Sequence, residues 1–152
     1  MHLIDANLLL YAVNADAPQH ANARAWLDQR LSSTEPVGFA WPSLVAFLRI
    51  STLSSLFPRP LSPATAKSKV DAWLAQPNVR IVQPTDDHWA IFGQLLVDCQ
   101  SGGNLVTDAH LAALAFEHGA TLCSTDMDFS RFPRLKWVNP LAGKAAGTSD
   151  SS

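Results

Sequence analysis

The sequence predicts an α/β fold with three layers, in which a central parallel sheet is flanked by helices. Short, apolar, strand-like stretches alternate along the chain with longer segments whose apolar residues follow a helical spacing. Strands that are separated by helices pair in parallel, and the connecting helices cover both faces of the sheet. With 152 residues, 47% of them hydrophobic, the chain can form one domain with a sizeable core.

The first half of the chain is expected to contain two strands and four helices. The strands are predicted at residues 2–5 and 37–41, and the helices at 7–13, 18–31, 42–53 and 63–75. Pro18 and Pro42 suit the first turn of a helix, because proline lacks an N–H that would be unpaired there. Ser62 is a good N-cap for the fourth helix, with Pro63 as its first residue.

The second half continues the alternation with three strands and two helices. The strands are predicted at residues 79–82, 120–124 and 137–138. Thr85 is expected to cap a helix whose apolar stripe contains Trp89, Phe92, Leu96 and Cys99.

A second helix is expected from Asn104, as its cap, to His118, and Gly119 supplies the left-handed residue after its end. This helix follows a Gly102–Gly103 turn. Residues 1–141 are therefore assigned to one α/β domain. Residues 142–152 are small and polar, and are expected to form a disordered C-terminal tail.

Composition and charge restrict the classes of function. A net charge of −2 and a pI of about 6.2 argue against a protein that coats nucleic acid through bulk positive charge. The two cysteines, Cys99 and Cys123, lack metal-binding spacing, which favours reduced thiols in the cytoplasm. No apolar run approaches the roughly 20 residues of a membrane helix.

Four aspartates occupy positions that ordinary surface charge does not explain. Asp5 and Asp126 each follow a predicted strand, so both are expected at the same edge of the parallel sheet. Asp108 lies near the start of a largely apolar helix, which must cross back over the sheet and begin near that edge. Asp128 follows Asp126 by two residues. Clustered carboxylates repel one another, and a hard cation such as Mg²⁺ relieves this repulsion.

Each of these aspartates also has a simpler interpretation. Asp5 could cap the helix that follows it, and Asp108 could owe its place to the helix dipole. Asp126 and Asp128 could belong to a turn in which aspartate binds its own backbone. Taken together, the carboxylates favour metal-assisted phosphodiester hydrolysis, in which one or two ions activate water and stabilise the leaving oxygen.

Several neutral and basic side chains accompany the carboxylates. Asn7, Thr107 and Thr125 could orient ligands or contact phosphate, although helix capping is the favoured role for Asn7. Arg131, Arg134 and Lys136 form a short basic run that could bind a phosphate backbone, or be solvated, and Arg49 could reach substrate or lie on the surface. Helical geometry turns His110 away from Asp108.

Three segments resemble the PIN-domain ribonucleases, and most closely the VapC-type toxins of bacterial type II toxin–antitoxin pairs. These segments are LIDANLLLYA, GNLVTDAHLAALA and STDMDFSRF, in the order and spacing of that family. The resemblance covers about residues 1–141. It implies a three-layer fold with a parallel sheet and metal-dependent endonucleolytic cleavage of structured RNA such as tRNA or rRNA.

The resemblance also implies the ligands and the partners. Asp5 and Asp108 become the principal ligands of Mg²⁺ or Mn²⁺, Asp126 the third acid and Asp128 a weaker helper. A cognate VapB-type antitoxin and a homodimer are expected partners. Where many family members carry a glutamate, this chain has Phe47, in the segment VAFLR. The site should therefore contain fewer carboxylates than is usual.

Two other functions fit parts of the sequence. A haloacid-dehalogenase-like phosphatase also begins with a strand that ends in aspartate, but Asn7 stands where its second aspartate is required. The other rival is a catalytically weak PIN-fold module that binds RNA or protein. Phe47 favours this module, whereas retention of three clustered carboxylates argues against it, and metal-dependent cleavage separates the two.

Overall fold

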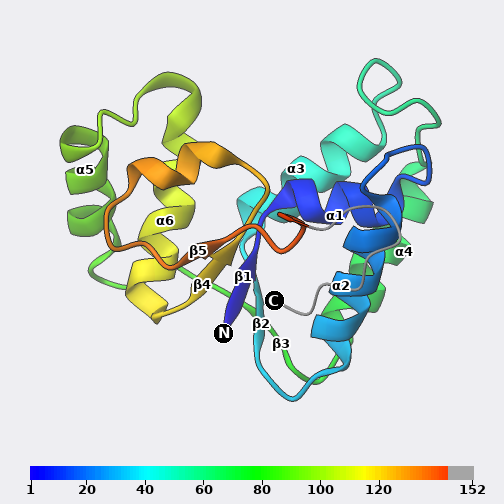
Figure 1. The fold of residues 1–152 in the computed structure, drawn as a ribbon, viewed down its shortest axis with the longest axis horizontal. Helices are drawn as coiled ribbons and strands as arrows, with labels where there is room; N and C mark the ends of the chain where they lie inside the picture. Colours follow the sequence, from blue (N-terminus) through cyan, green and yellow to red (C-terminus); the bar gives the residue numbers. More distant parts are fainter. Residues whose placement is uncertain (144–152) are drawn as a thin grey trace.

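A computed structural model describes residues 1–143 and confirms the α/β class with a central parallel sheet (Figure 1). Its five strands are β1 (His2–Ile4), β2 (Val37–Phe39), β3 (Val79–Ile81), β4 (Thr121–Cys123) and β5 (Trp137–Val138). All pair in parallel, in the order β3-β2-β1-β4-β5.

Helices cover both faces of the sheet and form two separate cores. One face is covered by α1 (Ala6–Val13), α2 (His20–Ser32), α3 (Trp41–Ser51) and α4 (Pro63–Leu74), and the other by α5 (His88–Asp98) and α6 (Val106–His118). Successive strand residues serve opposite faces, as a pleated strand requires. Ile4 and Cys123 pack with the first group of helices, and Leu3 and Leu122 with the second.

The order of the strands reverses between β1 and β4, and the region beyond the carboxyl ends of these two strands corresponds to the crevice where such sheets bind ligands. From β1 the sheet grows outward through β2 and β3, and then restarts on the other side of β1 with β4 and β5. In open parallel sheets, ligands bind beyond the carboxyl ends of the two strands where the order reverses. Asp5 follows β1 directly, and Ser124 follows β4. The fold therefore brings their neighbourhoods together at that crevice.

Helix boundaries differ from the predicted ones in three places. The second helix begins at His20, so Pro18 lies in the preceding turn and not in the first helical turn. Thr85 is not the N-cap of α5, which is Asp87; its hydroxyl accepts the Asp87 N–H in the turn before the helix and donates to Glu117. Asn104 lies inside a short 3-10 helix, Gly103–Leu105, that precedes α6. In the last two cases the helix starts after the residue with the good capping side chain.

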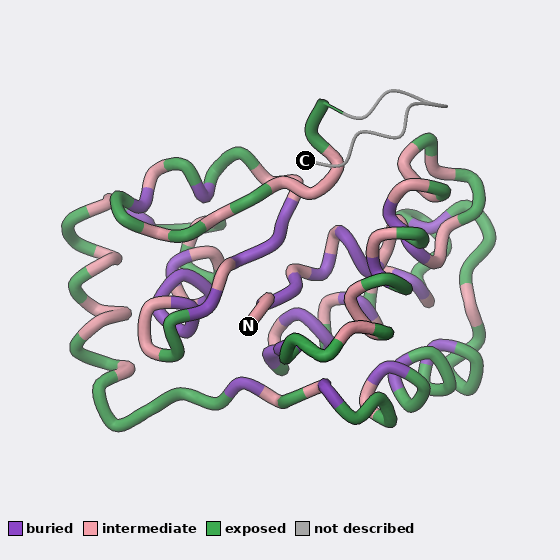
Figure 2. Tube along the Cα trace, turned by 60° about the horizontal axis from the view of Figure 1, so that its bottom comes forward, coloured by how far each residue is buried: buried purple, intermediate pink, exposed green. Residues whose placement is uncertain are grey.

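The predicted apolar stripe of α5 is only partly correct. Phe92, Leu96 and Cys99 pack against the core on the α6 side, but Trp89 is 71% exposed. No residue of α5 is fully buried, and Figure 2 shows this helix without a buried position. Its attachment to α6 therefore depends on partly buried contacts and on polar interactions.

Helix termini elsewhere agree with the sequence. Ser62 caps α4 by accepting the N–H of Thr65, and Pro63 is its first residue. Gly119 ends α6 with φ of 61°, in the left-handed region. The predicted tail starts in a turn, where the Ala142 N–H donates to the Asn139 carbonyl, and residues 144–152 lie outside the described part of the chain. Within the described part, no helix is long and apolar enough to span a membrane.

Candidate acidic metal centre

Asp5 occupies the junction between β1 and α1 and makes two different hydrogen bonds. Its Oδ1 accepts the N–H of Ala6 at 2.8 Å, so it caps α1 as the simpler interpretation proposed. Its Oδ2 accepts the hydroxyl of Ser124 at 2.8 Å. Capping and a place in the crevice are therefore compatible, because the two carboxylate oxygens point to different partners.

Ser124 is a fully buried hub that the sequence did not single out. Besides donating to Asp5, its Oγ accepts Asn7 Nδ2 at 3.0 Å and the Asp126 N–H at 3.0 Å. The Asn7 side chain also accepts the Thr125 N–H at 3.4 Å. Asn7 therefore joins α1 to the segment after β4, and the prediction that it caps a helix is wrong. The only signal in the sequence was the position of a serine directly after a strand.

Three carboxylates converge beside this hub. One oxygen each from Asp108, Asp126 and Asp128 lies within 4.8 Å of the others. Asp108 comes from the first turn of α6, and Asp126 precedes the 3-10 helix Met127–Arg131. Asp126 Oδ1 accepts the Asp128 N–H at 2.9 Å, so the D-x-D segment does form the predicted turn. Asp5 is not one of this close group, and it is linked to Asp126 through Ser124.

The pKa values of two carboxylates reflect burial and mutual repulsion. Burial raises the pKa of Asp5 and the nearby charge of Asp126 adds to this, against the hydrogen bonds from Ser124 and Ala6. The pKa of Asp108 is raised to about 7, first by burial and then by the charges of Asp126, Asp5 and Asp128. Near neutral pH the cluster therefore holds a proton on Asp108 for much of the time, as the clustering of the carboxylates predicts.

Arg131 is a basic residue whose positive charge acts on this cluster. It is partly buried at the end of the 3-10 helix, and its charge lowers the pKa of Asp108. Its Nη1 donates to the carbonyl of Cys99 at 3.3 Å, whereas its buried Nε has no hydrogen-bond partner. One side of the guanidinium group is thus anchored to the end of α5, near the cluster.

The other side chains singled out from the sequence have less contact with the cluster. Thr107 is exposed beside Asp108, and Arg49 is exposed on the last turn of α3. Phe47, in place of the usual acidic residue, is fully buried and packs edge-to-face on Trp73, with ring centroids 4.8 Å apart. Phe47 therefore adds a ring to the core and supplies no ligand atom, as the resemblance to the family implied.

The donor set of the centre fits a hard divalent cation. Carboxylate oxygens that converge within 4.8 Å are the ligands that Mg²⁺ and Mn²⁺ prefer. A cation would also compensate the repulsion that raises the pKa of Asp108. The exposure of Asp128 leaves the cluster open to solvent on one side. Such a centre can bind an ion and still leave positions for water and a phosphate group.

Comparison with known families and proteins agrees with this geometry. The PIN domain matches residues 2–135. Ribonuclease VapC37 of Mycobacterium tuberculosis is 48% identical over 142 residues, which cover 93% of this chain and 99% of that protein. Ribonuclease VapC43 of the same species is 42% identical over 144 residues, which cover 95% and 98%.

Solved structures with the same fold include a VapBC complex and a VapC toxin. VapBC2 of Rickettsia felis, bound to a promoter DNA fragment, gives a TM-score of 0.65 at 20% identity and covers 91% of this chain and 97% of that chain. Mycobacterium tuberculosis VapC20, a toxin that cleaves the sarcin–ricin loop, gives 0.63 at 18% identity and covers 86% and 93%. At these identities the likeness concerns the fold alone.

Proposed function

This chain belongs to the PIN domain family, in its VapC branch, and we propose that it is a metal-dependent endoribonuclease that acts as the toxin of a toxin–antitoxin pair. The observation that carries the proposal is the group of carboxylates at the β1–β4 crevice. It occurs in a chain that is almost half identical, over nearly its full length, to a protein named as a ribonuclease.

The proposed ligands are Asp108, Asp126 and Asp128, which are close enough to share one ion, with Asp5 as a further ligand or its support. The bound Mg²⁺ or Mn²⁺ would activate water and stabilise the leaving oxygen of an RNA phosphodiester. Ser124 holds Asp5 in place by its hydrogen bond, and Asn7 fixes the hydroxyl of Ser124 in turn. Ser124 thereby links Asp5 to the segment that carries Asp126.

Substrate contacts are proposed for residues around the rim. The guanidinium group of Arg131 is near enough to Asp108 for its charge to lower the pKa of that carboxyl. A phosphate held at the centre would be attracted by the same charge, because guanidinium groups bind phosphate oxygens well. Thr107, Thr125 and Arg49 remain candidates for weaker contacts with RNA, and tRNA or rRNA is the proposed substrate class.

A VapB-type antitoxin and a second copy of the chain are the proposed partners, and the cytoplasm the proposed location. The solved structure from Rickettsia felis is a VapBC complex, and the present chain shares its fold. Co-expression with the protein encoded next to this chain, followed by purification of either one, tests the first partner. Light scattering of the purified chain tests the dimer, and a monomer at micromolar concentration would contradict it.

The decisive experiment is cleavage of a mixed tRNA and rRNA pool by the purified chain in Mg²⁺ or Mn²⁺, and then in EDTA. Discrete products should appear with metal and disappear with EDTA. Asp108→Asn, purified in the same way, should lose cleavage while it keeps its fold. Asp86→Asn, which replaces an exposed carboxylate elsewhere, should keep both its fold and its cleavage activity. These two variants together exclude a contaminating nuclease.

The binding module remains the alternative because Phe47 removes one expected carboxylate. Folded protein that binds RNA but cleaves nothing with either metal would favour that module and reject the enzyme. Metal-dependent cleavage that is equal in the wild type and in Asp108→Asn would reject the assigned centre. Both outcomes are distinguishable by one gel and one binding assay.

A further inference from the structure

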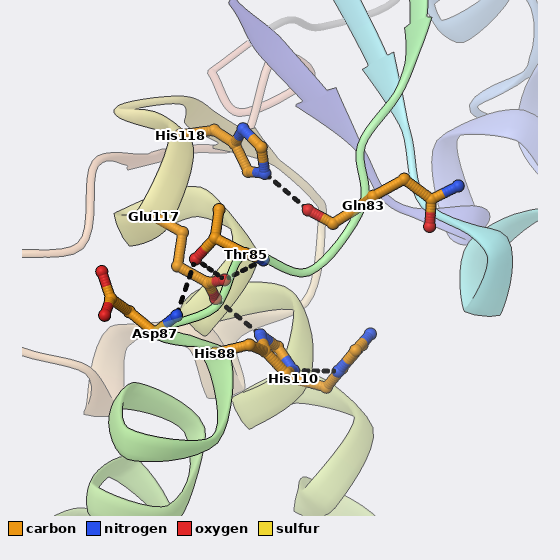
Figure 3. A network of polar contacts seen from close by, with 7 residues as sticks. All are labelled: Gln83, Thr85, Asp87, His88, His110, Glu117 and His118. Carbon is orange, nitrogen blue, oxygen red and sulfur yellow. Dashed lines mark hydrogen bonds and ion pairs between the residues drawn. The ribbon is translucent and has the colours of Figure 1, made fainter.

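A second convergence of metal-binding side chains lies away from the acidic centre, between α5 and α6 (Figure 3). His88, the first residue of α5, places its Nε2 3.0 Å from Nδ1 of His110, which lies in the middle of α6. The two rings are nearly perpendicular, at 80°, with centroids 4.7 Å apart. His110 thus faces α5, and not the carboxylates, which agrees with the helical geometry.

Glu117 fixes the orientation of this pair. Its Oε2 lies 2.6 Å from His88 Nδ1, and its side chain is only 1% exposed. Its Oε1 accepts both the N–H and the hydroxyl of Thr85, at 2.9 and 2.8 Å. Burial alone would raise the pKa of Glu117, but the hydrogen bonds from Thr85 and His88 lower it. Glu117 is therefore an ionised acceptor, and His88 donates its Nδ1–H to it.

This hydrogen bond decides which nitrogen of His88 is available to a ligand. With the proton on Nδ1, the lone pair of Nε2 points toward His110. A histidine that binds a metal commonly donates its other N–H to a carboxylate, which fixes the ring and makes the coordinating nitrogen more basic. Glu117 and His88 have this arrangement already.

We propose that His88 Nε2 and His110 Nδ1 bind a divalent transition-metal ion, with Zn²⁺ as the principal candidate. Imidazole nitrogens suit Zn²⁺, Ni²⁺ and Cu²⁺, whereas Mg²⁺ prefers oxygen. Zn–N bonds of about 2.1 Å at a tetrahedral angle separate two nitrogens by about 3.4 Å. To reach that spacing from 3.0 Å, the two nitrogens must separate by about 0.4 Å and each ring must turn its nitrogen about 35° away from the line that joins them.

The proton balance of the binding step is simple. Without metal, a proton on His110 Nδ1 bridges to the lone pair of His88 Nε2. When the ion takes its place, that proton moves to Nε2 of His110, so the neutral ring changes its tautomer and no proton is released. His88 keeps its Nδ1–H on Glu117 throughout. The two protein nitrogens leave the remaining ion positions to water, so binding should be weaker than at a structural zinc site with four protein ligands.

Access and shielding also fit a partly open site. The side chain of His88 is 14% exposed and His110 is partly buried. The ring of Phe92 lies against both imidazoles, with centroids 5.4 Å from His88 and 5.6 Å from His110. This apolar wall shields one side of the pair from water. The site shares no ligand with the acidic centre and does not depend on nuclease activity.

The direct test is nitrogen NMR of the histidine rings during a titration with Zn²⁺ alone. The full chain with Asp108→Asn is used, so that the acidic centre binds little metal. With one equivalent of Zn²⁺, the resonances of His88 Nε2 and His110 Nδ1 should shift, and the His110 proton should appear on Nε2. His118 is the internal control, because its Nε2 contacts the Gln83 carbonyl outside the pair. Its resonances should stay unchanged.

Calorimetry on variants of the same chain gives an independent measurement. His88→Gln and His110→Gln should each weaken Zn²⁺ binding at least tenfold, and Glu117→Gln about tenfold, as a second contact behind a ligand does. His118→Gln should bind as the parent chain does. Ring resonances that stay unchanged in millimolar Zn²⁺ would overturn the proposal, and this measurement needs no variant of the pair. Affinity that is equal in all four variants would overturn it as well.

Discussion

Replacing Asp108 by asparagine should stabilise the metal-free protein at alkaline pH. The raised folded-state pKa means that the unfolded chain releases this proton first, so stability falls as pH rises from about 4 to about 8. A pKa raised from 3.8 to about 7 would correspond to about 4 kcal/mol without solvent screening. Asp108 is only partly buried, and screening reduces the expected gain to about 1–2 kcal/mol.

The assay is thermal and urea unfolding in EDTA, at pH 5 and at pH 8, for the wild type and Asp108→Asn. At pH 8 the variant should unfold about 4 °C higher, because about 1 kcal/mol moves the midpoint of a domain of this size by about 2–4 °C. At pH 5 the folded wild type is uncharged at this position but its unfolded chain is already ionised, so about a third of the difference should remain. Asp86→Asn, which removes an exposed carboxylate outside the cluster, should show no comparable dependence on pH.

A variant that is less stable than the wild type at pH 8 would refute the reasoning. It would mean that Arg131 already compensates the ionised carboxylate of Asp108, so that no repulsion remains to be relieved. An equal gain at both pH values would also refute it, because a charge effect must shrink as pH falls toward the unfolded-state pKa of 3.8. Such a result would point to improved helix capping or packing instead.

Three further predictions concern other positions, all tested by urea unfolding. Ser124→Ala should cost about 1–3 kcal/mol, because it leaves buried partners of the hydroxyl unpaired, and should raise the pKa of Asp5 further. Phe47→Ala should cost about 3–5 kcal/mol, since its ring is fully buried, and a loss under 1 kcal/mol would contradict that packing. Gly119→Ala should cost about 1 kcal/mol for its φ of 61°, with no steric clash.

Much of the fold could be predicted because local signals and the global pattern agree. Strands were recognisable as short apolar runs between turns, and their alternation with helices implied a parallel sheet. The errors at Thr85 and Asn104 both place a helix start too early. The Thr85 hydroxyl does accept an N–H, from Asp87, but in the turn before α5, whose N-cap is Asp87. Asn104 lies inside a 3-10 helix that precedes α6. Good capping chemistry therefore located the start of each helix only to within a few residues.

The candidate site could be predicted only as a set of residue types at one edge of the sheet. Asp5 and Asp126 could be placed there from the ends of their strands, and the structure puts them there. Ser124 could not be found, because its role is to join two segments that are more than a hundred residues apart. The ranking of Asp128 below Asp126 stays a prediction, although the structure groups both with Asp108.

The raised pKa values give the acidic centre a defined dependence on pH. Both Asp5 and Asp108 resist ionisation in the metal-free protein, so protons and metal ions compete for the same carboxylates. Metal affinity should therefore increase with pH up to about 8, and metal should restore at alkaline pH the stability that ionisation removes. Phe47 lies in the core, and its ring stabilises the fold through its contact with Trp73. We therefore expect Phe47→Glu to destabilise the fold through a buried, unpaired charge, without strengthening the metal centre.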